Sequence, residues 1–152
     1  MEIYKEVGKM KIMVAYDGTL QAKEALVYGL DKVREKGGEV VALHVFNSGM
    51  FIDYDATVYA RGMAKAESEQ FINEAKAIIR EKGKGVKASL FSTEGNPTEE
   101  VIGFAKSEKV DVLLCPPKFT KIINKYQRAV AESELASEAA KLHVAAVSTK
   151  TM

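Results

Sequence analysis

The sequence predicts an α/β domain with three layers, in which helices cover both faces of a five-stranded, mostly parallel, doubly wound sheet. Five short apolar, β-prone runs recur along the chain, and helical patterns separate them. Strands that alternate with helices require crossover connections, which join parallel strands. Continuously apolar strands are also typical of a sheet covered on both faces. Because no repeat or linker divides the chain, we expect one domain over residues 1–152, with its core at about 11–148.

The predicted strands are short runs bounded by polar or turn-forming residues. In chain order they are KIMVAY (11–16), EVVALHVF (39–46), VKASLFS (86–92), VDVLLC (110–115) and HVAAVS (143–148).

The predicted helices lie between these strands. The first has apolar residues three and four apart and is closed by Gly37-Gly38, and the second covers 60–82. Their expected buried positions are Ala22, Ala25, Leu26, Gly29, Leu30 and Val33, then Met63, Ala64, Phe71, Ile72, Ala75, Ile78 and Ile79.

The start of the third helix is marked by GNPTEEVIGFA. Asn96 can cap the helix, Pro97 has the φ angle suited to its first position, and Glu99 stands where a capping box places it. A last helix is predicted over Gln127 to Leu142, with one apolar side formed by Ala131, Leu135, Ala139 and Leu142.

Composition and charge exclude several classes of function. With 22 Lys and Arg against 21 Asp and Glu, the formal net charge is only +1, so no overall electrostatic field attracts nucleic acid or anionic lipid. The lone Cys115 excludes an intramolecular disulfide and a cysteine-rich metal site. No apolar run is long enough to span a membrane, and MEIYKEVGKMK is neither signal peptide nor anchor. We expect a cytoplasmic protein without nucleic-acid or membrane partners.

The segment AYDGT ends the first strand, at the side of the sheet where doubly wound proteins bind ligands. Asp17 lies at the carboxyl edge, Gly18 permits a tight turn, and Thr19 can cap the next helix. One interpretation is a carboxylate that accepts from a ribose hydroxyl or holds a metal through water. The other is a strand-to-helix turn with its cap.

Four segments together resemble the universal stress protein family: VAYDGT, LHV, EGNPTEEVIGFA and VDVLLC, over about Lys11 to Ser148. The resemblance implies a Rossmann-like or flavodoxin-like domain of strand order 3-2-1-4-5 that serves in stress resistance. It also implies a homodimer paired through the last strand at a sheet edge, and hence an interface formed by Val144, Ala145, Ala146 and Val147.

Some members of this family bind ATP or AMP and others do not. The nucleotide-binding members keep an aspartate after the first strand, which Asp17 matches, and a hydrophobic residue that contacts adenine, which Val45 matches. If a nucleotide binds, the resemblance implies a site formed by Ala15, Asp17, Gly18, Thr19, Val45, Cys115 and Lys118.

The glycine motif that binds phosphate in this family is missing. It reads Gly, two residues, Gly, nine residues, Gly, then Ser or Thr, and here Pro116 and Phe119 replace the first two glycines. The last glycine of the chain is Gly103. Glycines let backbone N–H groups point at phosphate oxygens, whereas proline has no N–H to donate. We therefore expect no triphosphate cradle of the usual kind.

A basic patch follows instead, formed by Lys118, Lys121, Lys125 and Arg128. The last three share a helix face above an apolar stripe, so Thr120 onward reads as helical, with continuity into the last helix as one option. The patch either contacts an anion or an acidic partner, or is a solvated helix face.

Other candidates favour structural roles. We expect His44 and His143 to be satisfied histidines in strands, and Cys115 to be a buried small hydrophobe. Asp53 and Asp55 are too few for a metal site. The apolar loop at 47–60 is expected to pack on the sheet edge, in a dimer or over a pocket.

The function expected from these observations is not enzymatic, since no nucleophile with a base, metal cluster or phosphate loop stands out. We expect a homodimeric regulatory or interaction module that needs no cofactor and binds an unidentified protein partner. The alternative is a switch that binds ATP or AMP with Mg²⁺ through Asp17 and Val45, with basic side chains replacing the glycines and with slow hydrolysis.

Overall fold

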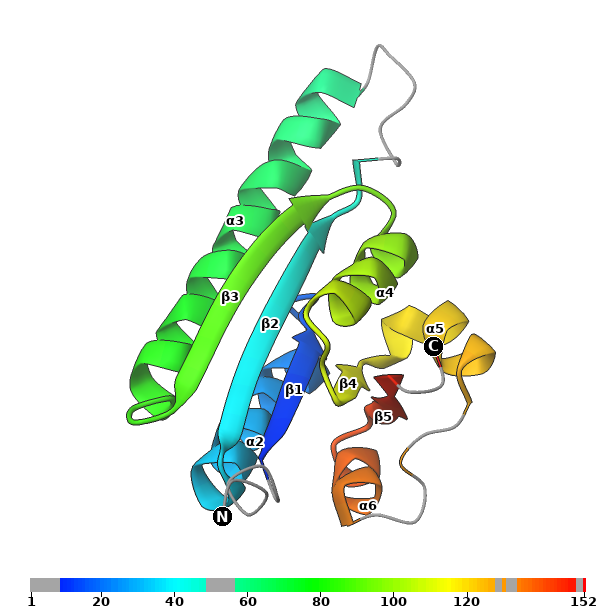
Figure 1. The fold of residues 1–152 in the computed structure, drawn as a ribbon. Helices are drawn as coiled ribbons and strands as arrows, with labels where there is room; N and C mark the ends of the chain where they lie inside the picture. The colour runs from blue at the N-terminus through cyan, green and yellow to red at the C-terminus, as the bar shows by residue number, and fades with distance from the viewer. Residues whose placement is uncertain (1–8, 49–56, 128–129, 131–133, 150–151) are drawn as a thin grey trace.

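A five-stranded sheet of order β3-β2-β1-β4-β5 forms the centre of the computed structural model, which describes residues 9–48, 57–127, 130, 134–149 and 152 (Figure 1). The strands are β1 (Met10–Ala15), β2 (Gly38–Phe46), β3 (Lys87–Glu94), β4 (Val112–Cys115) and β5 (Ala145–Ser148). β1 pairs in parallel with β2 and β4, and β2 with β3. The predicted fold class, the strand order and the edge position of β5 are confirmed.

The helices are α2 (Leu20–Lys36), α3 (Thr57–Lys82), α4 (Pro97–Ser107), α5 (Thr120–Lys125) and α6 (Glu134–Lys141), and a 3₁₀ turn, η2 (Pro117–Phe119), precedes α5. Local chemistry sets their ends as predicted. Asn96 Oδ1 accepts from the Glu99 N–H at 3.1 Å, with Pro97 at the first turn, and Gly37 ends α2 with a φ of 86°.

Two hydrophobic clusters cover the faces of the sheet. Side chains alternate along β1, so Ile12 and Val14 pack toward α2, α3 and α6, whereas Met13 and Ala15 pack toward α4 and α5. The amino-terminal part of α3 extends past the sheet (Figure 1), and Met63, predicted to be buried, is 58% exposed. That prediction was wrong because helical periodicity does not reveal where the sheet beneath a helix ends.

The predicted helix over 127–142 is also corrected. α5 ends at Lys125, Tyr126 leaves the helical region at φ −117° and ψ 59°, and α6 begins only at Glu134. Between them, the Val130 N–H donates to the Ala146 carbonyl of β5 at 3.0 Å. This bond draws the backbone away from helical geometry, so α5 and α6 are not continuous.

β5 runs antiparallel to β4, with Ala145 beside Cys115 and Ser148 beside Val112. The strand begins later than predicted, because His143 occupies a turn with φ 60° and the Val144 N–H donates to the Ala139 carbonyl. α6 therefore leads through a tight turn directly into a strand that runs back along β4, so the sheet is mostly rather than wholly parallel.

Candidate functional site

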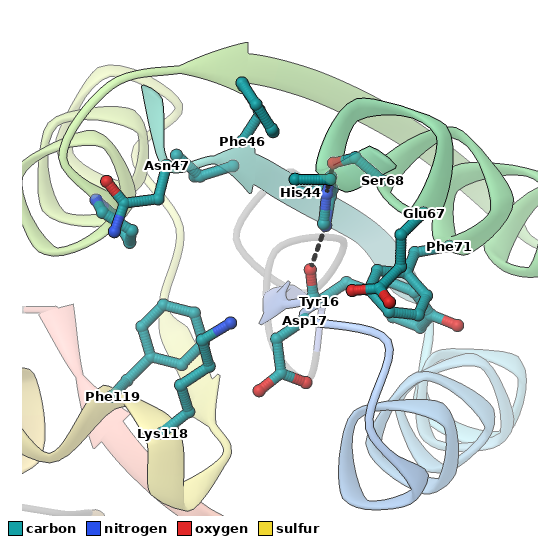
Figure 2. Close-up of a pocket in the computed structure, with 13 residues that line it drawn as sticks. Tyr16, Asp17, His44, Phe46, Asn47, Glu67, Ser68, Phe71, Lys118 and Phe119 are labelled. Atoms are coloured by element: carbon teal, nitrogen blue, oxygen red, sulfur yellow. Dashed lines mark hydrogen bonds between the residues drawn. The ribbon is translucent and has the colours of Figure 1, made fainter. Parts of the chain in front are cut away.

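A cavity of about 240 Å³ opens at the carboxyl ends of β1 and β2 (Figure 2). Its walls also include residues of α3, the first residue of α4 and the turn η2. The strand order reverses beside β1, so the cavity occupies the place where doubly wound folds bind ligands. It is lined by Tyr16, Asp17, His44, Val45, Phe46, Asn47, Ala64, Glu67, Ser68, Phe71, Pro97, Lys118 and Phe119.

Asp17 is only 6% exposed. Its two carboxylate oxygens have different surroundings, because one takes part in the strand-to-helix turn and the other is unpaired. Its Oδ1 accepts from the backbone N–H of Thr19 at 3.1 Å and from the Thr19 hydroxyl at 2.5 Å. The Thr19 hydroxyl in turn caps α2 by accepting from the Ala22 N–H at 3.2 Å. Oδ2 is closed to solvent and has no hydrogen-bond partner in the described part of the chain, so this buried carboxylate oxygen lacks a donor.

Gly18 allows this turn to form. Its φ is +80°, and a Cβ atom there would lie 2.4 Å from the ring of Phe71. A side chain at this position would therefore be strained and would displace an aromatic wall of the cavity.

His44 and Ser68 form an uncharged polar wall. His44 Nδ1 lies 2.8 Å from the Tyr16 carbonyl, which can only accept, so Nδ1 carries the proton. His44 Nε2 then accepts from the Ser68 hydroxyl. Burial lowers the pKa of His44, which keeps the imidazole neutral at neutral pH. The prediction of a satisfied, buried histidine is confirmed for His44.

Charged side chains reach the cavity from two further elements. Glu67 comes from α3, and Lys118 extends from η2 toward the cavity (Figure 2). Neither side chain has an ion-pair or hydrogen-bond partner among the residues that the structure describes. With Asp17, the described lining carries two carboxylates against one ammonium group.

Aromatic rings form much of the remaining wall, from Tyr16, Phe46, Phe71 and Phe119. Burial raises the pKa of Tyr16 to about 12, so its phenol stays protonated. Phe119 is 6% exposed and belongs to the cluster under α4 and α5.

The chain after β4 closes on itself. Pro116 is buried and extended, the Phe119 N–H donates to the Pro116 carbonyl at 2.9 Å, and the Thr120 hydroxyl donates to the Pro117 carbonyl at 2.7 Å. The polar groups of the turn thus form hydrogen bonds within the turn, and the Phe119 ring packs in the core.

The structure brings only some of the predicted ligand-binding residues together. Asp17, Val45 and Lys118 line the cavity, and Gly18 and Thr19 form the turn beneath it. Ala15 and Cys115 are fully buried in the cluster under α4 and α5, and burial raises the pKa of the Cys115 thiol to about 12.

The basic patch is divided in the structure. Lys118 lies at the cavity, whereas Lys121 and Lys125 are exposed on α5 and are not part of its lining. Arg128 lies outside the described residues, as do Asp53 and Asp55. The last residues of the predicted 47–60 loop belong to α3 instead, where Tyr59 is 77% exposed.

The residues predicted to form a dimer interface lie mostly inside this chain. Val144, Ala146 and Val147 are buried in its own clusters, Ala145 is half-buried, and the Ala146 carbonyl already accepts from Val130. His143 is exposed in its turn, so the expectation of a buried or half-buried strand histidine there was wrong.

The described residues include neither a candidate metal site nor a candidate membrane span. They contain no group of three or more His, Cys, Asp or Glu side chains placed to hold a metal ion. Among the helices drawn from those residues, none combines the length and the apolar character that crossing a membrane requires.

Sequence reasoning missed most of the lining, above all Glu67, Ser68 and Phe71 of α3. Ser68 carried one weak signal, as a polar residue on the apolar face of a predicted helix. Glu67 carried none.

Comparisons with known proteins are consistent with this geometry. A sequence model of the universal stress protein family matches residues 9–118, more than half of the chain, and ends at Lys118 beside the cavity. Universal stress protein MJ0531 of Methanocaldococcus jannaschii is 26% identical over 107 residues, which cover 68% of this chain and 62% of that protein. The chain therefore matches less than two thirds of that relative's length.

Two solved structures have a similar fold. Hypothetical protein MJ0577 gives a TM-score of 0.56 at 25% identity, over 70% of this chain and 74% of that chain. A protein of the universal stress protein family from Burkholderia pseudomallei gives a TM-score of 0.56 at 20% identity, over 70% of this chain and 80% of that chain.

Proposed function

Because this chain belongs to the universal stress protein family, we propose that it is a regulatory or interaction module of the stress response that works without an ATP-binding glycine loop. It acts by binding rather than by catalysis.

The turn after β4 carries this proposal. A phosphate cradle needs backbone N–H groups that point outward. Pro116 and Pro117 have none, and the N–H of Phe119 is bonded to the Pro116 carbonyl. Phe119 also fills the space below with its buried ring. Moreover, the cavity of about 240 Å³ is smaller than the roughly 300–1,000 Å³ typical of sites for drug-sized ligands.

The second candidate is a switch that binds ATP or AMP with Mg²⁺. Three observations favour it: Asp17 keeps a free carboxylate oxygen, Val45 lines the same cavity, and Lys118 points toward it. Lys121 and Lys125 are not part of the lining, so Lys118 alone would replace the missing glycines.

Nucleotide content and melting distinguish the two candidates. The purified protein is denatured, the supernatant is assayed for nucleotide, and the native protein is melted with ATP, AMP and Mg²⁺. A ligand at a hundred times its dissociation constant would add about 2.7 kcal/mol of stability. We expect no released nucleotide and no shift. A shift that disappears in Asp17→Asn, whose Oδ1 still accepts from Thr19, would establish the switch instead.

We further propose a homodimer formed through β5 in the cytoplasm. The edge position of β5 supports it, although contact would have to come from backbone groups and Ala145, since the neighbouring side chains are buried. Ala145→Arg should halve the mass measured by light scattering, whereas Ser89→Arg on the opposite edge strand should not. An unchanged mass for Ala145→Arg, or a wild-type monomer, would refute this interface.

A further inference from the structure

We propose that the cavity beside Asp17 binds a small zwitterion of the amino-acid type, in which one apolar body carries an ammonium group and a carboxylate. This inference rests on the proposed function, because it requires that no nucleotide fills the cavity.

The unpartnered oxygen of Asp17 selects the ammonium end. A carboxylate that is 94% buried loses solvation, which a donor with positive charge restores best. Oδ1 is already occupied by Thr19, so only Oδ2 remains for the ligand. Glu67 adds a second carboxylate to the same wall, where it strengthens the preference for a cation.

Lys118 selects the carboxylate end. Its side chain approaches the cavity from one side and Glu67 from the other, with Asp17 between them (Figure 2), and no described residue pairs with Lys118. A ligand that pairs with both Asp17 and Lys118 needs an ammonium group and a carboxylate, which an amino acid carries on one carbon atom. A ligand with an ammonium group alone would leave Lys118 unpaired and repelled.

The aromatic walls select an apolar body. Phe46, Phe71 and Phe119 surround the cavity, and aromatic faces also attract an ammonium group. His44 and Ser68 are bonded to each other and neutral, so they bring no further charge.

The same walls disfavour phosphate esters. A phosphate would bring up to two negative charges toward Asp17 and Glu67, with only Lys118 to compensate. The volume of about 240 Å³ also suits a compact molecule.

Matched ligands test the proposal on the intact chain. Binding is measured by calorimetry and melting with L-phenylalanine, with phenethylamine, which lacks the carboxylate, and with 3-phenylpropionate, which lacks the ammonium group. L-leucine, AMP and ATP complete the panel. We expect L-phenylalanine to bind, and to bind at least tenfold more tightly than its two analogues, because each analogue loses one charged hydrogen bond.

Variants then assign each end of the ligand. Asp17→Asn and Glu67→Gln should weaken binding of the amino acid and should not weaken binding of 3-phenylpropionate, whose repulsion by these two carboxylates they remove. Lys118→Met should abolish the preference for the amino acid over phenethylamine. Lys121→Met, an exposed lysine of α5 outside the lining, should change nothing. If Asp17→Asn fails to fold, Glu67→Gln and Lys118→Met still provide the test.

The possible failures are distinguishable. Equal binding of the amino acid and 3-phenylpropionate, or no binding of either amino acid while AMP and ATP also fail, overturns the zwitterion and leaves the proposed function standing. Binding of AMP or ATP that depends on Asp17 overturns both.

Discussion

Truncation of Phe119 to alanine tests whether hydrophobic packing holds the turn after β4 closed. A buried phenylalanine removes roughly 150–200 Å² from water, worth about 4–5 kcal/mol at 25 cal/mol per Å². Phe119 is 6% exposed, so nearly all of this area counts. Alanine keeps the Cβ, and water can enter from the adjoining cavity, so we expect a loss of about 3 kcal/mol in the free energy of unfolding.

The assay is urea unfolding followed by circular dichroism, because the chain has no tryptophan. Phe91→Ala is the matched control. Phe91 is 41% exposed on β3 and packs on Phe104 with ring centroids 5.1 Å apart, so its truncation should cost only about 1 kcal/mol. If Phe119→Ala costs no more than Phe91→Ala, the ring does not anchor the turn and the account of the closed loop is refuted.

Three further predictions concern the turn, an interhelix ion pair and the thiol. Gly18→Ala should cost about 2 kcal/mol or more, because its φ is +80° and an aromatic ring occupies the Cβ position, whereas Gly103→Ala in α4 has open space and should stabilise by up to about 1 kcal/mol. Equal shifts of the urea midpoint in Gly18→Ala and Gly103→Ala would contradict this prediction. Hydrogen bonds between Lys32 and Glu138 lower the pKa of Glu138 below 4.5 and raise that of Lys32 above 10.5. Their stabilisation is therefore lost as pH falls below about 4.5 or rises past 10.5, and Glu138→Gln should flatten both ends of the stability profile; a profile unchanged by Glu138→Gln would refute the pairing. Burial raises the pKa of Cys115 to about 12, so a disulfide reagent at pH 8 should react only after unfolding, and rapid labelling of the native protein would contradict its burial.

The order of elements was predictable because local chemistry determines it. Asn96 and Pro97 define the start of α4 with atoms only a few residues apart, and Gly37 ends α2 through its own backbone freedom. The apolar runs of β1, β2 and β4 become strands that neighbouring elements bury, whereas β3 at the sheet edge stays largely exposed. Asp17 lines the cavity, as expected of a residue at the end of the first strand in a doubly wound fold.

The C-terminal segment was predicted less well because two elements competed for it. Apolar spacing favoured a helix over 127–142, yet the hydrogen bond from Val130 to Ala146 takes part of that segment to the edge of β5. Apolar spacing indicates only which residues would share one face of a helix. It carries no information about a hydrogen bond between this segment and a strand.

The sequence by itself determined the α/β class, the helix caps, the carboxylate at the end of β1 and the absence of glycine after Gly103. Each depends on residue type and short-range spacing. The tertiary structure decided what surrounds that carboxylate. Glu67 and Phe71 reach it from α3 and Lys118 from η2, because helix packing on the sheet sets which side chains meet across separations of 50 to 100 residues. The charge and shape of the cavity arise from that packing, and neither is visible in any one segment.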